Sequence, residues 1–437
     1  MPALDSSWRE WIATNLERGC TRQGMFDILT AHGFAPGLVS EAIEHQPAPP
    51  PATFIPHGVR QPTEGVELYS LERFLSDGEC LRLIQLVRPQ LRPSTTTNEA
   101  GPYADYRTSK TCDLGLLDDP LAREVDQRIC KTLGIAASYG ETIQAQWYDV
   151  GEEFKPHTDT FEPSHAGFEQ NVGGRGQRTW TFMVFLNDVS EGGETHFTRA
   201  GVRFRPRRGQ ALIWNNLRPD GTPNPLTTHW GRPVGAGFKV ILTKWFRTQG
   251  EGTRHPREPN ERLPPLTQRG FLRLPTPPAL QAALQADLAA GEPQPEEVPG
   301  FIGGPDARPS VLFPLSDARK AQVHQTLQEL AEAWVGRYLE PTYVYGIRRY
   351  HRGTSLTCHR DRLATHVVSA ILNVDQEVDE PWPLEIDDHL YRRHRLLLAP
   401  GQLLLYEGGR LLHGRPRPLV GERFDNVFVH YRLRDEG

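Results

Sequence analysis

Two polar, proline-rich stretches interrupt the sequence and set the size of the units that can fold. The first covers residues 47–66 and the second covers residues 249–266, and both contain few apolar side chains that could enter a core. Proline-rich segments act as stiff, extended linkers. The breaks therefore predict three folded parts: a small helical unit at 1–46, a larger domain at 67–248 and a second large domain at 267–437.

Both large segments have the same order of local patterns. Each begins with a helical pattern, at 71–87 and at 317–335, and continues as short β-rich runs separated by Gly, Pro and Asn/Asp turns. The predicted strands are 180–186, 210–214, 238–246, 367–374, 394–398, 402–406 and 424–431. We expect an α+β protein with tandem double-stranded β-helix (jelly-roll) domains, outer helices and the small N-terminal helical unit.

Charge, cysteine usage and hydropathy argue against several classes of protein. The net charge of -5 gives no overall attraction to nucleic acid or to an anionic membrane. The five cysteines are odd in number and scattered, which argues against a disulfide framework or a thiolate zinc site. The sequence shows no signal peptide and no long apolar run. These features predict a cytoplasmic protein with no nucleic-acid or membrane partner.

His157 and Asp159 form the first half of a candidate metal site. Residues two apart in a strand project to the same face, so one imidazole and one carboxylate can reach a single ion. His229 lies 70 residues later, a distance that suits a later strand of the same barrel. Two His and one carboxylate form the facial triad of non-haem iron oxygenases, which leaves adjacent coordination positions open.

Two further residues have spacings that suit a cosubstrate carboxylate. Lys239 lies ten residues after His229, and Tyr148 lies nine residues before His157. A lysine can pair with the distal carboxylate of 2-oxoglutarate, and a tyrosine hydroxyl can donate a hydrogen bond to it. Taken alone, the lysine could equally be a solvated strand residue and the tyrosine ordinary core.

The segment from about Leu68 to Arg247 resembles the prolyl 4-hydroxylase family of 2-oxoglutarate oxygenases. The resemblance rests on the runs Y-x-x-G-x-x-F-x-x-H-x-D from Tyr148, R-x-x-T-x-x-x-F-L-N-D from Arg178, G-G-E-T-x-F from Gly192, G-x-A-L-x-W from Gly209, H-x-G-x-P-V-x-x-G-x-K-x-x-x-x-K-W from His229, and R-T-S from Arg107. It implies a double-stranded β-helix with iron(II) at His157, Asp159 and His229, and 2-oxoglutarate at Lys239 and Tyr148. Phe154 departs from the family, which often has tyrosine there.

The resemblance implies a dioxygenase that uses Fe(II), 2-oxoglutarate and O2, with ascorbate as an accessory stimulant. We expect hydroxylation of a C–H bond, with succinate and CO2 as coproducts, and a prolyl or other side chain of a peptide or protein as the target. Arg107, Arg178 and Trp245 are candidate substrate contacts. A free amino acid or a small natural product stays open as the substrate, and so do binding without turnover and a different metal. The oligomeric state is open.

The C-terminal segment repeats the constellation. His359 and Asp361 form a second H-x-D, His413 is a distal histidine, and Tyr350 lies nine residues before His359. Arg423 lies ten residues after His413, the interval that separates Lys239 from His229. We predict a second metal site at His359, Asp361 and His413 and a second cosubstrate site at Tyr350 and Arg423. The alternative is a barrel that only binds substrate or a partner.

Overall fold

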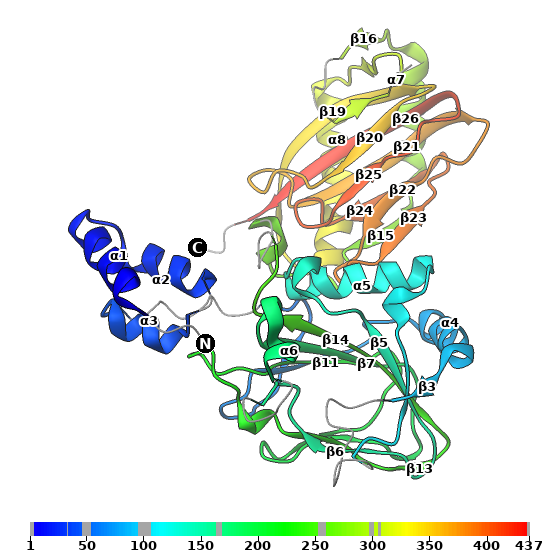
Figure 1. The fold of residues 1–437 in the computed structure, drawn as a ribbon. Helices are drawn as coiled ribbons and strands as arrows, with labels where there is room; N and C mark the ends of the chain where they lie inside the picture. The colour runs from blue at the N-terminus through cyan, green and yellow to red at the C-terminus, as the bar shows by residue number, and fades with distance from the viewer. Residues whose placement is uncertain are drawn as a thin grey trace. The chain divides into compact units, whose positions relative to one another are not determined.

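The computed structural model describes residues 4–32, 34–45, 54–94, 106–162, 168–251, 259–296, 301–304 and 307–434. The chain divides into two compact units, Met1–Pro256 and Arg257–Gly437 (Figure 1). Parts of both predicted linkers, residues 47–53 and 252–258, lie outside the described residues. Within the described ranges, no helix has the length and hydropathy needed to cross a membrane.

Three helices open the first unit: α1 (Ser6–Glu17), α2 (Arg22–Ala31) and α3 (Pro36–Ala42). The side chains of Asp5 and Thr21 accept hydrogen bonds from backbone N–H groups of α1 and α2, so both helices have polar N-caps. The helices share one apolar core, made by Leu4, Ile12, Met25, Leu29, Phe34, Val39 and Ile43.

Two facing antiparallel sheets make the body of the first unit. The larger runs in the order β1 (Val59–Arg60), β2 (Leu68–Leu71), β11 (Ala211–Asn215), β7 (Arg178–Phe185), β14 (Lys239–Arg247), β5 (Gln144–Tyr148), β4 (Lys110–Cys112) and β3 (Arg92–Pro93). The smaller runs β10 (Val202–Phe204), β9 (Thr195–Phe197), β12 (His229–Gly231) and β6 (Phe154–His157). A separate pair joins β8 (Glu191–Gly192) to β13 (Val234–Ala236).

Helices α4 (Asp77–Val87) and α5 (Pro120–Leu133) lie on one side of the larger sheet, and β6 lies on the other (Figure 1). Lys244 of β14 forms a 2.7 Å ion pair with Asp126 of α5. The predicted helix at 71–87 begins too early, because Leu71 ends β2 and Ser76 starts α4 with a capping box to Glu79. The predicted linker at 47–66 also contains β1, which pairs with β2.

The second unit also has two antiparallel sheets. The larger runs β15 (Phe271–Pro275), β24 (Gln402–Tyr406), β21 (Val368–Val378), β26 (Gly421–Leu433), β19 (Leu339–His351), β18 (Val311–Phe313) and β16 (Gln294–Pro295). The smaller runs β17 (Ile302–Gly303), β20 (Ser355–His359), β25 (His413–Arg415), β22 (Leu384–Asp387) and β23 (Arg393–Leu396). Helix α8 (Asp317–Val335), at its predicted bounds, and α7 (Pro278–Ala290) pack their leucines and valines into the core of the larger sheet.

The two units share a strand order. The series β2-β11-β7-β14-β5-β4 of the first unit corresponds to β15-β24-β21-β26-β19-β18 of the second. Their smaller sheets correspond in the same way, as β10-β9-β12-β6 and β23-β22-β25-β20. The expected α+β class with several antiparallel sheets is confirmed, and the matching order allows residues of the two units to be compared by strand register.

Candidate functional site

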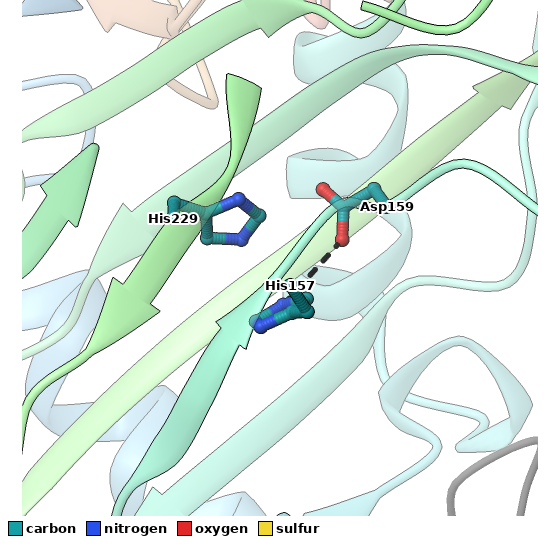
Figure 2. A group of neighbouring side chains, drawn as sticks. All are labelled: His157, Asp159 and His229. Carbon is teal, nitrogen blue, oxygen red and sulfur yellow. Dashed lines mark ion pairs between the residues drawn. The ribbon is translucent and has the colours of Figure 1, made fainter. Parts of the chain in front are cut away.

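Three side chains from the smaller sheet of the first unit point toward one another (Figure 2). His157 ends β6, His229 begins β12, and these two residues are paired partners in the antiparallel ladder. Asp159 follows β6, and its Oδ1 lies 3.9 Å from Nε2 of His157. The candidate ligand atoms of the three residues all lie within 4.8 Å of one another, so a single ion can reach all three.

Backbone carbonyls fix the orientation of both imidazoles. Nδ1 of His157 lies 2.7 Å from the carbonyl oxygen of Lys155, and Nδ1 of His229 lies 3.0 Å from that of Thr227. A carbonyl can only accept, so each Nδ1 carries the proton and each Nε2 is left as the metal-binding nitrogen. The partner is two residues earlier in both cases.

The electrostatics of the triad suit a divalent cation. Burial, together with the facing His229, lowers the pKa of His157 to about 3, so its imidazole is neutral. Burial acts to raise the pKa of Asp159, but His229, His157 and Arg178 hold this pKa below its ordinary value. The hydroxyl of Thr181 also donates a 2.6 Å hydrogen bond to Oδ2 of Asp159. Neutral imidazoles and an ionised carboxylate are the forms that bind metal.

A buried lysine lies in the same interior. Lys239 is 1% exposed and is the register partner of Tyr148 on β5, with its Nζ 4.6 Å from the centre of the Tyr148 ring. Its ammonium donates to the carbonyl of Gly193 at 3.0 Å, and burial lowers its pKa to about 8. Gly231 lies directly beside it, since a Cβ at this position would be 3.6 Å from Nζ. The Lys239 ammonium is therefore a desolvated cation next to the triad that can bind a small anion.

An open cavity, with about 450 Å³ of empty space when the solvent at its mouth is counted, joins the triad to Lys239. Tyr148, Arg107 and Trp245 line it, together with Gln146, Phe154, Thr181, Met183, Thr195, Trp214, Ile241 and Thr243. Burial raises the pKa of Tyr148, so its phenol stays protonated and can donate. Phe154 stacks on His157 with ring centroids 3.5 Å apart. Because Phe154 lacks the hydroxyl of the tyrosine that is common here in the family, it places an apolar ring against His157.

Arg178 is held by protein partners. Its guanidinium forms two 2.8 Å hydrogen bonds with the carboxylate of Glu141 and stacks 4.1 Å above the Trp245 ring. It is absent from the described residues that line the cavity, whereas Arg107 and Trp245 are present. The structure therefore brings two of the three predicted substrate contacts to the cavity and places Arg178 behind Trp245.

The second unit contains a matching triad. Oδ1 of Asp361 lies 3.7 Å from Nε2 of His359 and 3.7 Å from Nε2 of His413. Nδ1 of each histidine again lies close to the carbonyl oxygen two residues earlier, at 2.8 Å from Thr357 and 2.9 Å from Leu411. Ser369 corresponds to Thr181 by register and donates a 3.0 Å hydrogen bond to Asp361. The three candidate ligand atoms also lie within 4.8 Å of one another.

The prediction for Arg423 is wrong. Tyr350 has Phe424, not Arg423, as its register partner, and Phe424 is the residue that corresponds to Lys239. A shift of one residue along a strand turns the side chain to the other face of the sheet. The Arg423 guanidinium accordingly pairs with Asp375 at 2.7 Å and with Asp425 at 2.9 Å. Tyr350 itself is fully buried and faces the interior.

Residues that sequence reasoning missed include Thr181, Ser369 and Arg415. Thr181 stands in the R-x-x-T run, but nothing in the sequence indicates that its hydroxyl contacts the metal carboxylate. Arg415 lies two residues after His413, so strand alternation puts it on the same face. It is 2% exposed, and burial lowers its pKa to about 10.

Comparisons with known proteins agree with this geometry. Residues 143–247 match the model of the 2OG-Fe(II) oxygenase superfamily. The chain is 35% identical over 195 residues to probable prolyl 4-hydroxylase 3 of Arabidopsis thaliana, covering 40% of this chain and 66% of that protein. It is 31% identical to human prolyl 4-hydroxylase subunit alpha-1 over 185 residues, covering 42% of this chain and 34% of that subunit. It thus spans about two thirds of the plant relative and one third of the human one.

Among solved structures, the viral collagen prolyl hydroxylase of Paramecium bursaria Chlorella virus-1 is 22% identical. The match covers 43% of this chain and all of that one, with a TM-score of 0.34. The residues present fit the superfamily's metal and cosubstrate: the ligand atoms of His157, Asp159 and His229 lie close enough together for one ion, and Lys239 is a buried cation beside them. The chain therefore carries a prolyl 4-hydroxylase-like domain of the 2OG-Fe(II) oxygenase superfamily.

Proposed function

We propose that the first unit hydroxylates an unactivated C–H bond of a prolyl or other amino-acid side chain in a peptide or protein, with succinate and CO2 as coproducts. The observation that carries this proposal is Lys239, a desolvated cation that shares one cavity with a two-histidine, one-carboxylate triad. A triad alone serves many metals and reactions. A triad with a buried cation beside it suits a chelating 2-oxo dicarboxylate.

Each residue has a defined task in this proposal. His157, Asp159 and His229 hold iron(II), which when bound supplies O2 activation coupled to oxidative decarboxylation of 2-oxoglutarate. Lys239 binds the far carboxylate of 2-oxoglutarate, and the protonated phenol of Tyr148 donates a hydrogen bond to it. Phe154 and Trp214 wall the cavity with apolar rings that exclude water.

The substrate side of the cavity favours a target with its own hydrogen-bond acceptors. Nε1 of Trp245 is buried and has no partner among the described residues, and Arg107 lines the same cavity. Both groups can donate to peptide carbonyls. The relatives named above are prolyl 4-hydroxylases, which favours peptidyl proline as the substrate over a free amino acid or a small natural product.

We further propose that the chain is a tandem of two double-stranded β-helices after a helical unit, with boundaries near 46, 66, 248 and 266. The shared strand order and the matching triads support this division. The second unit would then be a second active site, and the alternative is that it only binds substrate or a partner. All five cysteines are unpaired, which suits a reducing compartment such as the cytoplasm.

The test is turnover of the full chain with Fe(II), 2-oxoglutarate and O2 on a library of proline-containing peptides. Mass spectrometry should find a product heavier by one oxygen atom, in amounts that match the succinate formed. The same library with proline replaced by alanine separates prolyl from other side-chain targets. Free amino acids and small natural products form a third arm. Oxidation there but in none of the peptides would contradict the peptide proposal.

A further inference from the structure

Arg415 is a cation buried inside the second unit without a counter-ion. Among the described residues, no carboxylate lies within ion-pair distance of its guanidinium, which instead stacks 4.7 Å from the Trp382 ring and 4.6 Å from the Phe424 ring. One guanidinium nitrogen donates to the carbonyl of Trp382, and the other terminal nitrogen is buried with no hydrogen-bond partner in the described structure. An uncompensated buried charge is costly, so such a site favours an anionic partner.

Strand register shows that the two units carry their buried cation on different strands. Gly231 and Arg415 correspond, because each lies two residues after the distal histidine on β12 or β25. Lys239 and Phe424 correspond, because each lies opposite the interior tyrosine, Tyr148 or Tyr350. In the first unit, Gly231 has no side chain and lies next to the lysine ammonium. In the second unit, Arg415 occupies the position of Gly231. Its guanidinium stacks on the ring of Phe424, which occupies the position of Lys239.

Tyr350 completes the second cation site. Its hydroxyl is fully buried and has no hydrogen bond of acceptable geometry to a described residue. Arg348, two residues earlier on the same face, is the other cation near this hydroxyl, but Glu296 binds its guanidinium at 2.6 Å and 2.5 Å. Nη2 of Arg415 and the hydroxyl of Tyr350 are thus unpartnered donors in this interior. They are the counterparts of the Lys239 ammonium and the Tyr148 hydroxyl of the first unit.

We propose that the second unit binds a small 2-oxo dicarboxylic acid of the 2-oxoglutarate class, with Arg415 and Tyr350 as the anchor for its far carboxylate. The proposal rests on the metal site proposed at His359, Asp361 and His413, which would chelate the 2-oxo acid end. A guanidinium presents two parallel N–H donors and so matches a carboxylate. Arg415 and His413 project from the same face of β25, which puts the metal and the anchor on one side of one short strand.

Calorimetry of the full chain under anaerobic conditions, loaded with Mn(II), tests this by counting bound molecules. We expect two metal ions and two molecules of 2-oxoglutarate per chain. Arg415→Met should keep both metal ions but bind one molecule of 2-oxoglutarate, and Lys239→Met should also bind one. If the first unit's proposed function is wrong, Lys239→Met will leave the count unchanged while Arg415→Met still lowers it. Glutarate, which lacks the keto oxygen, should bind the second site at least tenfold more weakly.

If Arg415→Met fails to fold, two smaller changes still test the proposal. Tyr350→Phe removes only the unpartnered hydroxyl and should weaken 2-oxoglutarate about tenfold at the second site, with the metal count unchanged. Arg423→Gln is the matched control, because Asp425 keeps its pair with Arg349, and should still bind two molecules. The proposal is overturned if Arg415→Met binds as many molecules of 2-oxoglutarate as the wild type, if Lys239→Met binds none, or if Tyr350→Phe and Arg423→Gln behave alike.

Discussion

The hydroxyl of Thr181 donates a 2.6 Å hydrogen bond to the carboxylate of Asp159, and Asn216 fixes the direction of that bond. The side-chain amide of Asn216 donates to the Thr181 oxygen at 2.8 Å, so the hydroxyl proton is free to point at Asp159. The free Oδ1 of Asp159 then faces His157. A chain of hydrogen bonds from the core thus holds the carboxylate in the orientation that a metal requires.

Thr181→Val should lower metal affinity at the first site by about 10- to 100-fold, because it keeps the shape of the side chain and removes the donor. Titration of the metal-free chain with Mn(II), followed by calorimetry, gives the affinity. Thr181→Ser keeps the hydroxyl and should bind nearly as tightly as the wild type. Equal affinities for the valine and serine variants would show that the bond to Asp159 has no part in metal binding.

Lys239→Met should raise the KM for 2-oxoglutarate by about 30- to 150-fold, since a charge-assisted hydrogen bond contributes about 2–3 kcal/mol. The first-site metal affinity should change little, because Lys239 is not a ligand. Lys131→Met on the outer helix α5 is the control, as it makes the same change on an exposed residue. The role assigned to Lys239 fails if both variants show the same KM as the wild type.

The affinity of the first site for 2-oxoglutarate should depend on pH above about 8. Burial lowers the pKa of Lys239 to about 8, so the free protein carries the ammonium below this pH and loses it above. Binding of a dicarboxylate needs the charged form, so the dissociation constant should be flat below pH 8 and rise up to tenfold per pH unit above it. In Lys239→Arg the cation stays protonated, and the rise should disappear. A rise that persists in the arginine variant would point to another group.

Glu141→Gln should destabilise the fold by about 2–3 kcal/mol, because it leaves Arg178 and Arg247 without their shared carboxylate. Burial acts to raise the pKa of Glu141, but the two arginines hold it below its ordinary value. The ionised carboxylate therefore stabilises the fold at neutral pH, and this effect is lost as the pH falls from the ordinary glutamate pKa through the lower pKa of the folded state. Urea unfolding at pH 7 and pH 4 should show the variant's deficit shrinking in acid. A deficit that stays the same would contradict the ion-pair role.

The pairing of each histidine with its aspartate is predictable from the sequence, because strand alternation is a local rule. H-x-D places two ligands on one face wherever the segment is extended, and the structure brings His157, Asp159 and His229 together as that rule expects. Helix α8 was also predictable at both ends, since Ser316 caps its start and Gly336 ends it in the left-handed conformation.

The anchor of the second unit was not predictable from interval counting. The interval from His413 to Arg423 equals that from His229 to Lys239, but the connection between the strands differs by one residue and reverses the face. The register becomes known only when both strands are paired with their neighbours. The hydrogen bonds of Thr181 and Ser369 depend on the same long-range pairing, so no local pattern reveals them.

The most direct test of the central claim compares succinate formation by His157→Ala and His359→Ala with the wild type. Each variant removes one histidine from one triad, so the two are matched. We predict that His157→Ala abolishes succinate formation coupled to peptide oxidation, while His359→Ala retains the first unit's share of it. Full coupled turnover by His157→Ala would contradict the assignment of the oxygenase site to His157, Asp159 and His229.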